Sequence, residues 1–91
     1  MKNTNQKKRN YLVPVDASDG ILSTAKKVVA NGGFFPFKYV MGTPDAPASG
    51  ESGTGIIIGH SDAYFVIIAF PYRTAGAMYI RYRDNGWIKL A

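Results

Sequence analysis

Residues 77–91, AMYIRYRDNGWIKLA, decide the fold, because their alternating side chains are typical of a β-hairpin. A two-residue turn at Asn85-Gly86 would mix apolar and charged side chains on each face. A three-residue loop at residues 84–86, with Gly86 in a left-handed bulge, separates them. The expected pairs are then Arg83 with Trp87, Tyr82 with Ile88 and Ile80 with Leu90.

That register gives the hairpin two different faces. The face expected to point to the core holds Met78, Ile80, Tyr82, Ile88 and Leu90. The candidate glycan-binding residues share the other face, and they are Tyr79, Arg81, Arg83, Trp87 and Lys89. Exposed aromatic rings beside basic side chains suit a sugar or an anion. A second interpretation is that Trp87 packs on the aliphatic stems of the arginines and seals the sheet.

Length and charge indicate one small domain with a separate tail. The chain has 91 residues, enough for one modest core, and no cysteine, which excludes disulfides and cysteine-based sites. Its formal net charge is +5, with four of the basic residues among the first ten. We therefore expect residues 1–10 to be a basic flexible tail and residues 11–91 to form the domain. No signal peptide and no membrane insertion are expected, because no long apolar run is present.

The rest of the chain predicts one helix and several strands. Apolar residues at helical spacing start at Ile21, with Ser18 or Asp19 as N-cap and Asn31-Gly32 as the stop. Extended segments are expected near residues 11–15, 33–41, 55–59 and 63–70, and a long exposed loop at residues 42–55. The predicted fold class is α+β and β-rich. One short helix packs on a mainly antiparallel sheet of four to five strands that ends in a C-terminal β-hairpin.

The segment 63–70, AYFVIIAF, is apolar on both faces. Tyr64, Val66, Ile68 and Phe70 share one side, while Phe65 and Ile67 lie on the other. Both sides need cover, which the helix, the curling sheet or a second copy of the chain can supply. This pattern is the main argument from the sequence for a homo-oligomer.

No pattern of residues predicts an enzyme, a cofactor or a metal site. His60, Ser61 and Asp62 are neighbours in a predicted tight turn, where they cannot align as a catalytic triad. His60 is the one histidine, and the six acids fall in turns, caps or loops. The glycines of residues 50–55 lack the lysine and helix of a phosphate-binding loop.

From residue 31 onward, the order of features resembles the C-terminal knob domain of phage tail fibres and tail-like bacteriocins, the pyocin knob family. The matching segments are Gly33-Phe34-Phe35, the loop 42–55, Gly55-Ile56-Ile57-Ile58, residues 64–70, Tyr79-Ile80-Arg81-Tyr82-Arg83 and Asn85-Gly86-Trp87. This chain has Leu90 where members often carry a second tryptophan. The resemblance implies a non-enzymatic module, often trimeric, in a virion tail or tail-like particle.

The expected function is that of a phage tail fibre or tail-tip module for attachment to bacterial surface glycans. Partners would be further copies of the chain, as in a homotrimer, or other tail proteins. The first alternative is a structural cap, decoration or assembly protein of a virion or tail. The second is single-stranded nucleic-acid binding, which has less support because the basic excess lies in the tail.

Overall fold

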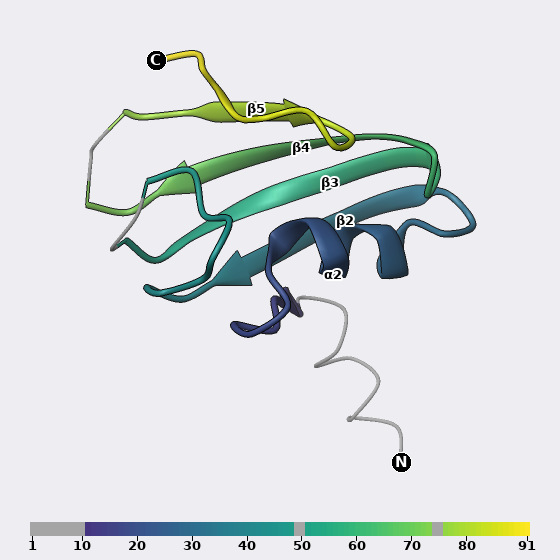
Figure 1. Cartoon of the computed structure of the whole chain (residues 1–91), viewed down its shortest axis with the longest axis horizontal. Helices are drawn as coiled ribbons and strands as arrows, with labels where there is room; N and C mark the ends of the chain where they lie inside the picture. Colours follow the sequence, from purple (N-terminus) through teal and green to yellow (C-terminus); the bar gives the residue numbers. More distant parts are fainter. Residues whose placement is uncertain (1–10, 49–50, 74–75) are drawn as a thin grey trace.

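The structure is a computed structural model that describes residues 11–48, 51–73 and 76–91, and the expected tail at residues 1–10 lies outside these ranges. The elements are, in order, β1 (Val13–Pro14), α2 (Ile21–Val28), β2 (Gly33–Tyr39), β3 (Gly53–Ser61), β4 (Tyr64–Pro71), β5 (Tyr79–Tyr82) and β6 (Ile88–Lys89). Figure 1 shows α2 lying against one side of the sheet. The predicted β-rich domain with one short helix is confirmed for the described residues. Their one helix is too short to cross a membrane.

The six strands form one mixed sheet, and their order in it follows the chain. β1 pairs with β2 in parallel, and all other neighbours are antiparallel. We expected four or five strands. The described sheet has six, of which β1 and β6 are only two residues long. Strands this short carry almost no alternation, so the sequence cannot count them reliably.

The pairing of β5 with β6 differs from the expected register by two residues. Ile80 lies opposite Ile88 and Tyr79 opposite Lys89, whereas the prediction placed Ile80 opposite Leu90. The predicted pairs Arg83 with Trp87 and Tyr82 with Ile88 are wrong for the same reason. Because side chains alternate with a period of two, this shift leaves every side chain on its expected strand face. The loop between the strands is longer than the predicted bulged turn.

Helix α2 is capped from a distant loop and not by its own preceding residues. Gly20 is the N-cap, with φ 97° and no side-chain hydrogen bond, so the predicted caps Ser18 and Asp19 are wrong. The Asp45 carboxylate accepts hydrogen bonds from the backbone nitrogens of Ile21 at 2.6 Å and Leu22 at 2.8 Å. A Cβ at position 20 would lie 2.6 Å from Asp45 Oδ1, so glycine is what admits this carboxylate.

The core lies between the sheet and the layer formed by α2 and its flanking loops. Alternate residues of β2, β3 and β4 point to it, and its fully buried side chains are Ile21, Ala25, Val29, Phe37, Ile57, Ile67 and Ala69. Glycines in β3 make room for large neighbours. A Cβ at Gly55 would lie 2.5 Å from Phe37 Cε1, and one at Gly59 would clash with Val29. The helix can therefore approach the sheet closely on this side.

Candidate functional site

The predicted glycan-binding residues do not form one exposed face. Trp87 is half-buried and packs against the core, and the Arg81 side chain is only 11% exposed. Tyr79 is half-buried, while Lys89 and Arg83 are exposed. The prediction that all five side chains share an open surface is therefore wrong. It fails because the hairpin turns its polar side, not its apolar side, toward the helix and the loop after β2.

Arg81 and Trp87 both contact Asp45, which lies in the loop after β2. We call these three residues the Asp45 clamp. Trp87 Nε1 donates a hydrogen bond to the Asp45 carbonyl oxygen at 2.7 Å. The Arg81 guanidinium carbon lies 5.7 Å from the Trp87 ring centroid, and its Nη1 lies 3.7 Å from Asp45 Oδ2. The same carboxylate caps α2. The clamp therefore ties together β5, the residue directly before β6, the loop and the helix, which agrees with the interpretation that Trp87 seals the sheet.

The opposite side of the sheet carries two apolar rows that run straight across the strands. The strand register places Phe34, Ile58, Val66 and Tyr82 in the first row. The second row contains Pro36, Ile56, Ile68, Ile80 and Ile88. We call these nine side chains the open sheet face. No described helix or strand covers them, whereas the residues that alternate with them face the core.

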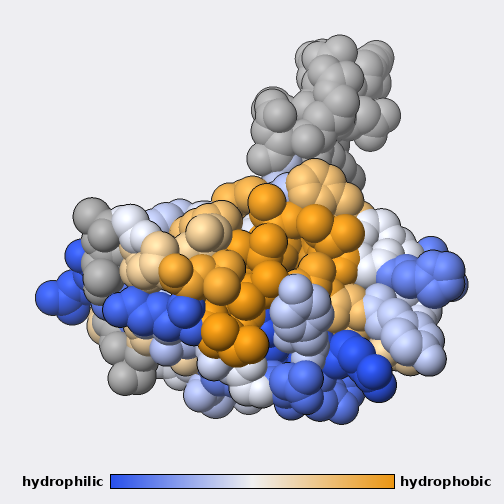
Figure 2. All heavy atoms as spheres, turned by 90° about the horizontal axis from the view of Figure 1, so that it is seen from above, coloured by the Kyte–Doolittle hydropathy of each residue, from blue (hydrophilic) through white to orange (hydrophobic). Residues whose placement is uncertain are grey.

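The open sheet face exposes large apolar side chains. Phe34 is 59% exposed, Ile58 44%, Tyr82 51% and Ile88 52%, and the neighbouring Leu90 is 52% exposed. Figure 2, seen from the side of β5, shows apolar residues gathered in one patch, with hydrophilic residues to its left, to its right and below it. The prediction that Ile80, Tyr82, Ile88 and Leu90 belong to the core of the single chain is therefore wrong.

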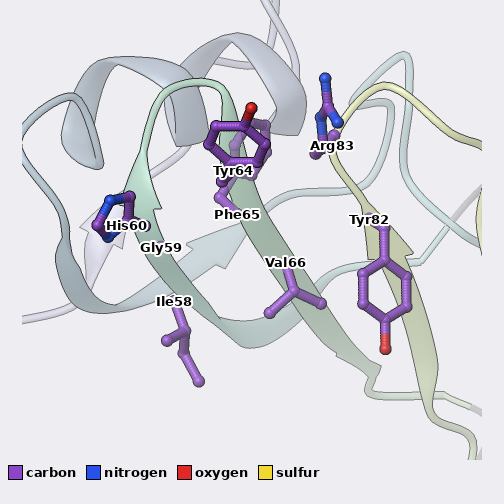
Figure 3. A pocket seen from close by; sticks show the side chains of 8 residues that line it. All are labelled: Ile58, Gly59, His60, Tyr64, Phe65, Val66, Tyr82 and Arg83. Carbon is purple, nitrogen blue, oxygen red and sulfur yellow. The ribbon is translucent and has the colours of Figure 1, made fainter.

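A shallow hollow of about 380 Å³ lies at one end of this face, beside the turn between β3 and β4. Ile58, Val66 and Tyr82 line it from the open sheet face, and His60, Tyr64 and Arg83 stand around it. In Figure 3 the Tyr82 and Arg83 side chains leave β5 in opposite directions. The hollow is therefore an extension of the open sheet face with basic groups at its rim.

Arg83 holds an unusual position at this rim. Its backbone is left-handed, with φ 54°, the one positive value at a non-glycine residue in the described ranges. Its N–H donates to the Phe65 carbonyl oxygen at 3.1 Å, and its guanidinium carbon lies 5.2 Å from the Tyr64 ring centroid. Within the described part of the chain its guanidinium forms no ion pair, whereas the neighbouring Asp84 pairs with Lys26 at 3.2 Å.

Two side chains with shifted acidity lie away from this face. Hydrogen bonds from the Ser18 hydroxyl and backbone lower the pKa of Asp16, which is the ordinary effect of a turn that stabilises the carboxylate. Burial raises the pKa of Tyr39 to about 12, and the nearby negative charge of Glu51 acts in the same direction. Asp16 lies in an exposed turn and Tyr39 in the core, so the two groups do not form an acid–base pair.

The hairpin sequence does not reveal the open sheet face, because apolar strand residues normally point to the core. The segment 63–70 does indicate it, because its two apolar faces cannot both be covered by one short helix, and the sequence therefore predicts a second cover there. Comparison of the chain with protein-family models, with curated proteins and with solved structures gave no match. The resemblance to the knob domain therefore stays a prediction.

Proposed function

We propose that this chain is a non-enzymatic assembly module that works by burying its open sheet face against another protein chain. The observation that carries the proposal is that, among residues 11–48, 51–73 and 76–91, a six-stranded sheet with two apolar faces has a covering layer on one side only. Stable domains bury each apolar sheet face against a second layer. An exposed apolar patch of this kind marks a protein contact or an aggregation hazard.

The chemistry of the rows favours protein over the other partner classes. The second row consists of one proline and four isoleucines, whose side chains offer no hydrogen-bond donor and no aromatic ring on which a base or sugar can stack. Aliphatic side chains of this kind pack well against another apolar surface. Of the functions expected from the sequence, this face supports a structural or assembly role best. Its setting in a tail particle rests on the resemblance alone.

The proposal is tested by comparing the tagged wild-type chain with an Ile58→Lys and Ile88→Lys double variant in the cells from which it comes. Both positions are exposed in the single chain, so the substitutions should leave its fold intact. We expect the wild-type chain to be isolated with associated protein chains, including untagged copies of itself, and the variant to lose them. Ala30→Lys, at an exposed position after α2, is the matched control and should retain them. Equal recovery with the double variant would refute the proposal.

The hollow supports glycan attachment as a second candidate function. Tyr64 is 61% exposed and Tyr82 51% exposed, and Arg83 has no carboxylate partner in the described residues. Aromatic rings beside a guanidinium that is not paired with a carboxylate suit an acidic sugar. Retention on an immobilised uronate polysaccharide should fall with Tyr64→Ala and with Arg83→Ala. Tyr11→Ala removes an equally exposed ring from the other end of the sheet and should have no effect. Retention that none of these changes alters would remove this candidate.

A further inference from the structure

The open sheet face has the size that a small dimer interface needs. The five strands of the face have four spacings of about 4.8 Å and so span about 19 Å from β2 to β6. Along the strands, the seven residues of β2 span about 23 Å, while β5 and β6 are shorter, with four and two residues. The area of the face is therefore at most about 440 Å² before the surrounding side chains are added. Stable protein interfaces bury about 600–1,000 Å² on each partner. Contact across the whole face and its rim reaches the lower part of that range.

The surface suits a partner that is flat, apolar and uncharged at its centre. All charged residues near the rows lie at the rim, with Lys38 at one end of β2 and Arg83 at the far end of β5. The middle of the face therefore presents only apolar side chains to whatever covers it. Two sheets of this type pack face to face with a spacing of about 10 Å, and their side chains interdigitate.

We propose that the open sheet face is covered by a second copy of this chain, which makes a two-fold dimer with the two sheets face to face. This inference rests on the proposed function and names its partner. An open face with a repeated row of isoleucines offers the same apolar surface to a second copy, as a two-fold interface requires. The uncharged centre means that two identical copies meet without like charges in the buried part. The dimer has helix, sheet, sheet and helix as successive layers, so no large apolar face stays in water.

The test measures the mass of the purified full chain in solution by sedimentation equilibrium, from micromolar to several hundred micromolar. We expect a species of twice the chain mass of 9.9 kDa. The Ile58→Lys and Ile88→Lys double variant should weaken self-association by about 100-fold or more, because it buries two unpaired charges in each copy. Ala30→Lys should leave the mass unchanged. Circular dichroism and cooperative unfolding show whether the variants remain folded.

A cysteine cross-link provides a second measurement that does not depend on destabilising the interface. The chain contains no cysteine, so the single thiol of Ile68→Cys can be joined only to another molecule. Ile68 lies in β4, the middle of the five strands of the face, where a two-fold axis that overlaps the two faces must pass close by. A short bifunctional thiol reagent should cross-link Ile68→Cys efficiently and the exposed Ala30→Cys only weakly.

Different outcomes separate this inference from the proposed function. A monomeric mass throughout, with no preferential cross-link at position 68, would overturn the second copy as the partner. The proposed function would survive that result if the double variant still lost an associated protein in cells. A dimer that the double variant does not weaken would place the contact elsewhere and also overturn the inference. Binding of the monomer to vesicles of anionic phospholipid, abolished by the double variant, would refute both, because the face would then contact a lipid surface.

Discussion

The two faces of the sheet are built from the same strands but have different chemistry and different cover. On the covered face, glycines make room for large side chains at particular positions, so that Gly55 lies beside Phe37 and Gly59 beside Val29, and the large side chains of this face belong to the core. On the open sheet face the rows contain only medium and large apolar side chains. One face is thus shaped to fit a particular layer of the same chain, while the other is uniformly apolar along its two rows.

The isoleucines of β3 show this difference at adjacent residues. Ile57 is completely buried against the helix layer, and Ile58, the next residue, is 44% exposed on the opposite side. Both have the same side chain, and both lie between β2 and β4 beside a phenylalanine and a β-branched residue, whereas the layer that covers them differs. The burial of an isoleucine here is therefore decided by what lies over the sheet and not by the strand sequence. Substitutions at the two positions test the comparison directly.

The largest expected effect is that of Ile57→Ala, which should lower the free energy of unfolding by about 2–5 kcal/mol, because it leaves a cavity in the core. Ile58→Ala should cost less than about 1 kcal/mol in the monomer, since the side chain is half in water there. Urea unfolding at low protein concentration measures both. If a second copy covers the open sheet face, the effect of Ile58→Ala should grow with protein concentration. Equal effects at low concentration would contradict the difference between the faces.

The second-largest expected effect concerns Asp45, which holds α2 and the loop after β2 over the covered face of the sheet. Asp45→Asn should destabilise the chain by about 1–3 kcal/mol. The asparagine has one accepting oxygen for two helix N–H groups, and Arg81 loses its negatively charged neighbour. Asp62→Asn, at an exposed residue of the β3–β4 turn, is the matched control and should change stability by less than about 0.5 kcal/mol. A loss at Asp45 as small as the control's would mean that the clamp contributes little.

The sequence predicted the composition of each face better than the position of the core. Alternation correctly grouped Ile80, Tyr82 and Ile88 on one side and Arg81 and Trp87 on the other, because period two is a property of the strand itself. It did not show which side the helix covers. Apolar residues are normally assigned to the inside, and that rule fails here because the sheet has two apolar faces while the described part of the chain supplies one covering layer.

The Asp45 clamp could not be predicted, because it depends on contacts between distant residues. Asp45 caps a helix that begins 24 residues earlier and accepts the indole hydrogen bond of a tryptophan 42 residues later. The sequence predicts caps only from the residues next to a helix, which here suggested Ser18 and Asp19. Gly20 was the available clue, since a left-handed glycine just before a helix makes room for a group from elsewhere.

The alkaline limit of stability should also distinguish the faces. The pKa of Tyr39 is raised to about 12 by burial, whereas an unfolded tyrosine titrates near 10. The unfolded chain therefore loses this proton first, so the contribution of Tyr39 is complete below about pH 10 and falls as the pH rises toward 12. By pH 11 the loss should be on the order of 1 kcal/mol. Tyr39→Phe should remove it, while Tyr82→Phe, on the open sheet face, should leave it. An unchanged alkaline loss in Tyr39→Phe would contradict this assignment.

The smallest expected effect is that of Trp87→Phe, and it decides whether the tryptophan belongs to the cover or to a binding surface. The substitution removes the hydrogen bond to the Asp45 carbonyl oxygen and leaves most of the ring packing. It should therefore cost about 0.5–1.5 kcal/mol of stability. Self-association and polysaccharide retention should both stay at the wild-type level, because the ring lies on the side of the sheet away from the open sheet face. A variant of unchanged stability that no longer bound polysaccharide would instead assign Trp87 to recognition.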